Sequence, residues 1–275
     1  MADVAVTVLG GGVAGLSTAL LLARQGHPVV LIERDRFEDS PAEDAQTWER
    51  RGIPHFLQPH AFIPRARSEL RTQLPDVYAA LLEAGATEID GRKKMPTGSV
   101  EDGDEELQYL AARRPLIEWA LRRAVDGEDI EVRDGVTIDG LHIDAGRITG
   151  VGVDGKIRPA TVVVDALGRR TPTQGWLAEG GIATTPIETS DCGVVYYSRY
   201  YRTSNGFELP DGPLGAQPAR RPRVPGVGHV PRRQRHVRGV AVGAERGSGV
   251  AGPVRRVGVR GRRRLHPGSA AMGRS

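Results

Sequence analysis

The sequence predicts an α/β fold organised around a parallel sheet. This prediction rests on the N-terminal segment. Residues 4–9 and 29–32 are short apolar runs rich in β-branched side chains, the pattern of strands that are buried on both faces. Between them, apolar residues over 16–23 recur at helical spacing, and Gly26 follows where such a helix would end. The chain therefore begins with a βαβ unit.

A glycine motif, G-x-G-x-x-G, joins the first expected strand to the helix through Gly10, Gly12 and Gly15. In such a turn the first glycine permits a tight bend, the second lets a pyrophosphate approach the backbone, and the third lets helix and strand pack closely. Val13 and Ala14 begin the helix, whose N-terminus offers free N–H groups and a positive dipole end. The turn is therefore suited to a phosphate-containing ligand.

An acidic residue, Glu33, closes the second expected strand and is followed by Arg34. A carboxylate at this place is suited to accept hydrogen bonds from ribose hydroxyls, and it would repel a 2′-phosphate. The alternative is a glycine-rich turn in an ordinary α/β protein. Here, however, the strand, glycine motif, helix, second strand and acid all follow in order. The segment therefore predicts a Rossmann-type dinucleotide-binding domain.

Composition narrows the class of protein. No stretch approaches the roughly 20 uninterrupted apolar residues of a membrane-spanning helix, and Asp3 stands where a signal peptide needs positive charge. Cys192 is the single cysteine, which excludes an internal disulfide and a cysteine-based metal site. Because Pro59 separates His55 from His60, no helix presents both histidines, and we expect no metal. A cytoplasmic protein fits these features best.

The rest of the body is expected to alternate helices, strands and loops. Residues 34–51 are polar and irregular, and 52–60 form a loop containing prolines and histidines. Helices are expected over 61–74, 76–84 and 113–125, and strands over 106–112, 130–133 and 161–165. A small β-meander is expected over 136–143, 147–153 and 156–160, with turns at 144–146 and 154–155.

For two of these elements the sequence also predicts which side chains are buried. In the helix over 113–125, Pro115 suits the first turn. Its apolar face is expected to consist of Leu116, Trp119, Ala120 and Ala124. The strand over 161–165 contains three consecutive valines and is therefore expected to be buried on both faces.

Four segments in this order resemble the flavin-dependent monooxygenases of the p-hydroxybenzoate hydroxylase type, including bacterial relatives that act as epoxidases, hydroxylases or halogenase-like enzymes. They are the glycine motif through Glu33, the loop G-I-P-H-F-L-Q-P-H over 52–60, R-P-L-I-E-W over 114–119, and V-V-D-A-L-G-R-R-T over 163–171. The glycine motif alone is common to many dinucleotide folds, whereas the four segments together are much more specific. The resemblance covers residues 1 to about 210.

The resemblance implies an FAD cofactor, NAD(P)H as a transient reductant, and a small organic molecule as the substrate that is oxygenated. Glu33 would face the adenosine ribose, and Arg114 would lie along the pyrophosphate side of the flavin; a surface salt bridge is the alternative for Arg114. The residues implied to contact FAD are Gly10, Gly12, Val13, Ala14, Gly15, Glu33, Arg34, Arg114 and Gly168. Since the cofactor carries the redox chemistry in such enzymes, no catalytic acid, base or nucleophile is assigned.

One position departs from the family pattern. Gly168 falls where the family has the glycine of an Asp-Gly pair beside the cofactors, but Leu167 replaces the aspartate. This departure weakens any inherited contact with a pyridine nucleotide. Asp165, two residues earlier, is expected to cap the end of its strand instead.

The C-terminal part differs in composition from the rest. Residues 216–275 contain fifteen arginines, no lysine, one acidic residue and no aromatic residue. Such a segment cannot bury enough apolar area to offset the entropy lost on ordering. No Gly-Asp pair follows Asp165, although the family has a second FAD motif of that kind. A tail of this composition is typical of a shifted frame of GC-rich DNA, so we expect a truncated or frameshifted family member after about residue 215, whose activity in this form is open.

We therefore expect an FAD-binding domain over 1–180, the start of a substrate-binding domain over 181–215, and a disordered tail over 216–275. Two other functions stay open. One is a non-flavin oxidoreductase that uses NAD at the same site. The other is a nucleic-acid-binding protein acting through its arginine-rich tail, although that tail lacks the aromatics that stack on bases. The substrate, the choice between NADH and NADPH, and the oligomeric state are not set by the sequence.

Overall fold

The computed structural model describes residues 5–37, 39–50, 52–53, 55–57, 60–96 and 98–190, together with the backbone of two short strands. These strands, β11 (Val195–Tyr197) and β12 (His236–Arg238), pair in parallel. They fall in the segments expected to hold the start of a substrate-binding sheet and the basic tail. The other residues of those segments after residue 190, and the predictions made for them, lie outside the described residues.

The predicted parallel sheet is confirmed. It has the strand order β10-β1-β2-β6, with all neighbouring strands parallel. The four strands are β1 (Val6–Leu9), β2 (Val29–Ile32), β6 (Ile130–Arg133) and β10 (Val162–Asp165). Helix α1 (Val13–Arg24) connects β1 to β2, as the glycine motif and the helical spacing predict. The mixed α/β architecture is therefore of the Rossmann type.

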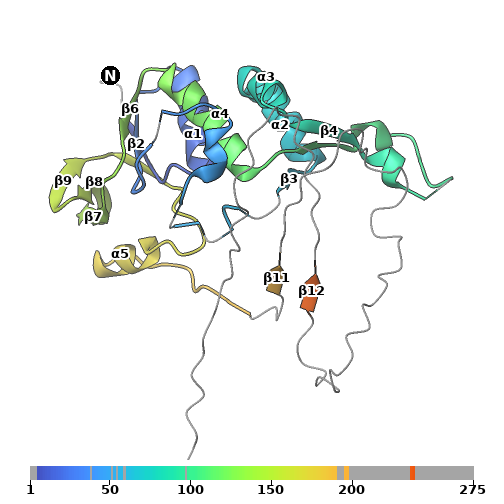
Figure 1. Cartoon of the computed structure of the whole chain (residues 1–275). Coiled ribbons are helices and arrows are strands. Elements are labelled where there is room, and N and C mark those ends of the chain that lie inside the picture. Colours follow the sequence, from blue (N-terminus) through green and yellow to red (C-terminus); the bar gives the residue numbers. More distant parts are fainter. Residues whose placement is uncertain are drawn as a thin grey trace, which may run out of the picture. The chain divides into compact units, whose positions relative to one another are not determined.

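One face of this sheet is covered by α1 and α4 (Arg114–Asp126), which lie side by side (Figure 1). Leu16 and Leu20 of α1 are fully buried and belong to the same core cluster as Val8 and Leu31 of the strands. Burial of such side chains stabilises the fold by about 1.5–3 kcal/mol each. This packing fixes the N-terminus of α1 at the carboxyl ends of the strands.

The buried face of α4 differs from the predicted one. Trp119 and Ala120 are buried as expected, but Leu116 and Ala124 are only partly buried. Ile117, Glu118, Leu121, Arg122 and Val125 are buried as well. The prediction placed only apolar side chains in the interface, whereas the structure also buries Glu118 and Arg122. Because every residue from Ile117 to Arg122 is buried, α4 is covered on more than one side.

The other face of the sheet is covered by the predicted meander. It consists of β7 (Ile138–Asp144), β8 (Arg147–Val153) and β9 (Lys156–Pro159), all antiparallel. Its second turn holds Asp154 and Gly155 at φ values of 48° and 71°, the left-handed conformations that a tight hairpin turn requires. Val151 and Val153 pack in one cluster with Leu9 and Ile32. Because side chains alternate along a strand, this cluster lies opposite α1.

A second, antiparallel sheet has the order β3-β5-β4. Its strands are β3 (Ala61–Phe62), β5 (Gln108–Ala111) and β4 (Thr87–Asp90), accompanied by α2 (Pro64–Gln73) and α3 (Pro75–Glu83). The helix predicted from residue 61 therefore begins later, because Ala61 and Phe62 pair with Ala111 and Leu110. Strands β3 and β4 were not predicted. The remaining elements are the helix α5 (Thr173–Glu179) and the 3₁₀ turns η1 (Asp44–Thr47), η2 (Gly91–Lys94) and η3 (Asp104–Glu106).

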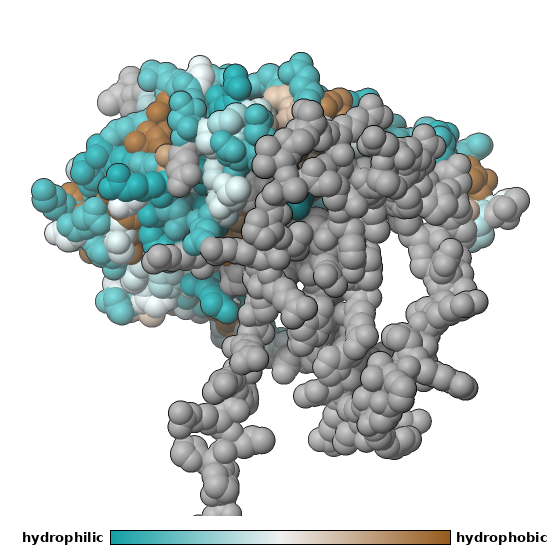
Figure 2. Space-filling model, in the orientation of Figure 1, coloured by the Kyte–Doolittle hydropathy of each residue, from teal (hydrophilic) through white to brown (hydrophobic). Residues whose placement is uncertain are grey.

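The burial predicted for β10 is wrong. It forms an edge of the four-stranded sheet, and Val162 is 45% exposed. The run of valines suggests two covered faces, but at this edge of the sheet Val163 and Val164 are only partly buried. On the face that Figure 2 shows, the described residues are mainly hydrophilic, and their apolar residues form small separate patches. No helix of the described residues is long and apolar enough to cross a membrane.

Candidate dinucleotide-binding site

The N-terminus of α1 is open to a ligand. Gly12 is its N-cap in an extended conformation, and no side chain caps the helix. The first intrahelical hydrogen bond runs from the N–H of Leu16 to the carbonyl oxygen of Gly12, at 2.9 Å. The N–H groups of Val13, Ala14 and Gly15 therefore have no acceptor within the helix. No acidic residue lies in the first turn, so the positive dipole end is free to attract an anion.

The three glycines of the motif are required for different reasons. A Cβ on Gly15 would lie 1.8 Å from the carbonyl oxygen of Gly10. Gly10 itself has φ +100°, and its Cβ would lie 2.7 Å from the carbonyl oxygen of Ala166. At Gly12 the nearest atom is Nη2 of Arg114, at an ordinary contact distance of 3.6 Å. The protein itself excludes a side chain at Gly10 and Gly15, whereas the surface beside Gly12 has room for a ligand.

Arg114 is held over the glycine turn. Its Nε donates to Oε1 of Glu118 at 2.9 Å, and its Nη1 lies 2.9 Å from Nε2 of His55. The third nitrogen, Nη2, faces the open side of Gly12. The structure thus brings together Gly12 and Arg114, which are far apart in the sequence. A guanidinium at this place is suited to a phosphate oxygen.

Glu33 lies directly after β2, beside the glycine turn, but it is 6% exposed. Its Oε2 accepts from the N–H of Gly11 at 2.5 Å and from Nη2 of Arg50 at 2.9 Å. Its Oε1 accepts from the N–H of Asp35 at 2.8 Å. A carboxylate has about four acceptor positions, so one position is left for a ribose hydroxyl. That contact remains a prediction.

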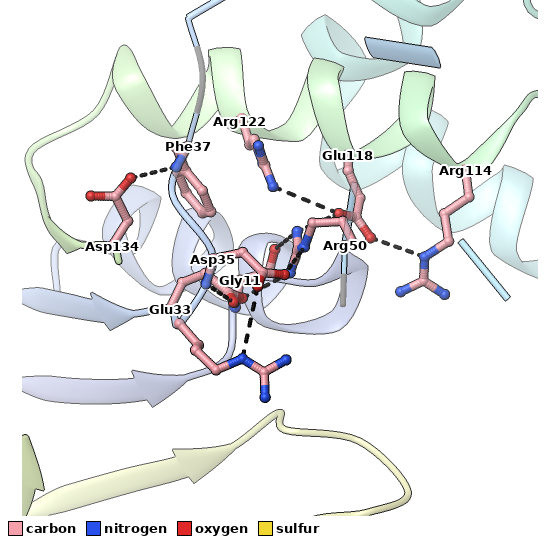
Figure 3. A network of polar contacts seen from close by, with 10 residues as sticks. Gly11, Glu33, Asp35, Phe37, Arg50, Arg114, Glu118, Arg122 and Asp134 are labelled. Carbon is pink, nitrogen blue, oxygen red and sulfur yellow. Dashed lines mark hydrogen bonds and ion pairs between the residues drawn. The ribbon is translucent and has the colours of Figure 1, made fainter. Parts of the chain in front are cut away.

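Arg50 is the centre of a buried ionic network that sequence reasoning missed (Figure 3). It donates to Glu33, to Asp35 at 2.7 Å and to Glu118 at 2.6 Å, and its side chain is 5% exposed. Burial lowers the pKa of Arg50, but the carboxylates of Glu118, Glu33 and Asp35 outweigh it, and the net shift is upward. The one sequence signal is the spacing of Arg114, Glu118 and Arg122, which places three charges on one side of α4.

Arg122 of α4 packs against aromatic side chains of the segment that follows β2. Its guanidinium carbon lies 4.1 Å from the ring centroid of Phe37 and 4.4 Å from that of Trp48. The Nη2 atom is 3.9 Å from Oε2 of Glu118, and both Nε and Nη2 are buried without a hydrogen-bond partner. Burial and the positive charge of Arg50 lower the pKa of Arg122 to about 10. The segment that covers Gly11 and Glu33 is therefore held by stacking on this cation.

Comparison with known proteins agrees with this geometry. Residues 5–116 match the family model described as DAO, FAD dependent oxidoreductase. Residues 5–116 are thus similar to a domain of the FAD-dependent oxidoreductase family. The matched segment contains the glycine turn, Glu33 and Arg114, and FAD is the dinucleotide of this family.

Two further proteins and one solved structure are similar to this chain. The chain is 27% identical to Protein Rv3254 of Mycobacterium tuberculosis over 73% of this chain and 45% of that protein. It is 30% identical to the probable electron transfer flavoprotein-quinone oxidoreductase YdiS of Escherichia coli over 58% of this chain and 35% of that protein. The crystal structure of pqsL, a probable FAD-dependent monooxygenase from Pseudomonas aeruginosa, is 20% identical, with a TM-score of 0.48 over 67% of this chain and 48% of that chain. This chain thus spans less than half the length of each of these three proteins.

The loop after β10 reaches the glycine turn through Ala166, which limits the space beside Gly10. Asp165 caps its strand as predicted: Oδ1 accepts from the N–H of Leu167 at 2.9 Å, and Oδ2 accepts from Oγ1 of Thr171 at 2.6 Å. Gly168 follows at φ +82° in an exposed turn. Its contact with FAD remains a prediction.

The remaining residues considered in the sequence are Arg34, His55 and His60. The side chain of Arg34 is exposed, and its Nε lies 3.8 Å from Oδ1 of Asp35. The contact of Arg34 with FAD remains a prediction. The rings of His55 and His60 are 5.5 Å apart. Within the described residues, no three side chains of the metal-binding types come together.

Proposed function

We propose that this protein is an FAD-dependent monooxygenase, a hydroxylase or epoxidase that transfers oxygen to a small organic molecule and uses NAD(P)H as a transient reductant. One observation carries the proposal. The four sequence segments that resemble the flavin monooxygenases meet at one place in the structure: Arg114 contacts His55 at 2.9 Å and lies beside Gly12, and Ala166 abuts Gly10. Convergence of segments this far apart in the sequence is expected of a site.

In this proposal the pyrophosphate of FAD lies on the N-terminus of α1, against Gly12 and the N–H groups of Val13 and Ala14. The Nη2 atom of Arg114 neutralises a phosphate oxygen, and Glu33 accepts from the adenosine ribose. Bound FAD supplies the redox chemistry, and the protein binds and orients it. The proposed division is an FAD-binding domain over 1–180, the start of a substrate-binding domain over 181–215 and a tail over 216–275.

We expect Gly12→Val to weaken FAD binding about 100-fold and to leave the fold unchanged. A Cβ at Gly12 meets only Arg114 at 3.6 Å, so the protein tolerates it, but the branched side chain would hold the pyrophosphate away from the helix N-terminus. The affinity is measured by quenching of flavin fluorescence, and the fold by circular dichroism. Gly175→Val is the matched control, because a Cβ there meets nothing within 4 Å. Equal FAD affinity in the two variants would contradict the assignment.

A second candidate function is electron transfer from a reduced flavoprotein to a quinone, favoured by the 30% identity with YdiS. The two candidates differ in the electron donor. We expect NADH or NADPH to bleach the flavin absorbance under anaerobic conditions, and oxygen to restore it with formation of an oxygenated product when the substrate is present. Reduction only by an electron transfer flavoprotein would favour the second candidate. A purified protein without flavin absorbance would favour the non-flavin alternative.

A further inference from the structure

His55 lies in the loop that resembles the flavin monooxygenases, and the proposed function gives it no role. It contacts the one guanidinium nitrogen of Arg114 that is not otherwise accounted for. Nε of Arg114 is held by Glu118, and Nη2 faces Gly12. Nη1 lies 2.9 Å from Nε2 of His55. The two contacts at Nε and Nη1 fix the plane of the guanidinium, and only Nη2 is left for a ligand.

The chemistry of this pair determines the state of the imidazole. A guanidinium has N–H donors and no acceptor, so Nε2 of His55 must accept the hydrogen bond. The ring is therefore neutral, with its proton on Nδ1. Partial burial lowers the pKa of His55 below its usual value of 6.5, and the positive charges of Arg114, His60 and Arg169 lower it further. Among the described residues these are the charged groups that shift the pKa of His55, and each of them favours the neutral form.

We propose that neutral His55 is a positioning residue that aims Arg114 at the phosphates of the bound dinucleotide. The inference rests on the proposed FAD site. When the imidazole gains a proton, Nε2 becomes a donor, the hydrogen bond is lost, and two positive groups repel each other. Because the pKa of His55 is lowered in the folded protein, this change occurs on the acid side of pH 6.5. FAD affinity then falls as the pH falls through that region.

If His55 had a different role, the pH dependence of FAD affinity would have the opposite sign. A protonated imidazole is itself a cation, and if it served the phosphates directly, FAD affinity would rise in acid. Three variants separate the two roles. Gln offers a neutral acceptor in about the same place at every pH, Leu offers none, and Lys offers a permanent charge and no acceptor. His55 as a whole is exposed and only its ring is partly covered, so these replacements leave the core intact.

The experiment titrates FAD into the chain of residues 1–275 at pH 8 and pH 5.5. We expect His55→Leu and His55→Lys to bind FAD about tenfold more weakly than the parent chain at pH 8, as for loss of a charge-assisted contact. We expect His55→Gln to bind within about twofold of the parent and to lose the acid dependence that the parent shows. His142→Leu, at an exposed histidine of β7, is the matched control and should leave the FAD affinity at both pH values unchanged.

A readout without FAD tests the contact itself. Nitrogen-15 NMR of the imidazoles, assigned by comparison with His55→Gln, is expected to show the Nδ1–H tautomer for His55 at pH 8. The Nε2–H tautomer, equal affinities for His55→Leu and His55→Gln, or tighter binding by His55→Lys would each overturn the positioning role while leaving the FAD site in place. A parent chain that binds no FAD at either pH would overturn the proposed function and this inference together.

Discussion

Gly15→Ala is expected to prevent the chain from folding, or to lower its free energy of unfolding by more than about 4 kcal/mol. The new Cβ would lie 1.8 Å from the carbonyl oxygen of Gly10 and 3.3 Å from Cβ of Ala166. Because the first contact is with backbone, no side chain can rotate away, and α1 must move off β1. Overpacking of a well-packed core typically costs about 1–3 kcal/mol, and a clash this short costs more. Small domains are stable by only about 5–15 kcal/mol.

Urea unfolding followed by circular dichroism measures the loss. Gly175→Ala is the control, because it adds the same methyl group within a helix where nothing lies within 4 Å. If Gly15→Ala unfolds at the same urea concentration as the parent chain, the close approach of α1 to β1 does not exist. Together with Gly12→Val, this variant separates the two functions of the glycine motif: one glycine serves the fold and the other serves the ligand.

The βαβ unit was predictable because its signals are local. The apolar runs, the helical spacing and the glycine motif each act within a few residues, and Gly26, at φ +85°, ends α1 where the sequence indicates. The meander was predictable for the same reason, since Asp154 and Gly155 adopt the conformations that a tight turn demands. Strand β3 was not, because two residues carry no periodicity. Its conformation is set by its partner β5, far along the chain.

The site was predictable only in part. Gly12, Glu33 and Arg114 could be named from the motifs, and the structure places them around one turn. The network that holds them could not be named, because Arg50 lies in a polar segment with no periodic pattern. Burial of a charge becomes favourable only when distant partners converge on it, and sequence spacing does not report that convergence. In the sequence, the charged residues of α4 resemble a solvent-exposed face. Only the structure shows that Glu118 is buried against Arg50.

Glu118→Gln is expected to lower the free energy of unfolding by about 3–5 kcal/mol, the usual cost of breaking a buried ion pair by removing one partner. Glu118 is fully buried and accepts from Arg50 at 2.6 Å and from Arg114 at 2.9 Å. Its replacement leaves three arginines around one neutral amide. Arg50 keeps Glu33 and Asp35, but Arg122 loses its nearest carboxylate, at 3.9 Å. FAD affinity should fall as well, since Nε of Arg114 is no longer held by a carboxylate.

A second substitution tests whether uncompensated charge is the cause. Arg122→Met in the Glu118→Gln background removes one cation from the interior and keeps an apolar side chain against Phe37 and Trp48. The double variant is therefore expected to recover about 1–3 kcal/mol of the lost stability, measured as a coupling energy in a double-mutant cycle of urea unfolding. Glu69→Gln is the control, because Glu69 pairs with Arg65 on the exposed side of α2. Additive effects of the two buried substitutions would show that Glu118 acts through packing and hydrogen bonding rather than through its charge.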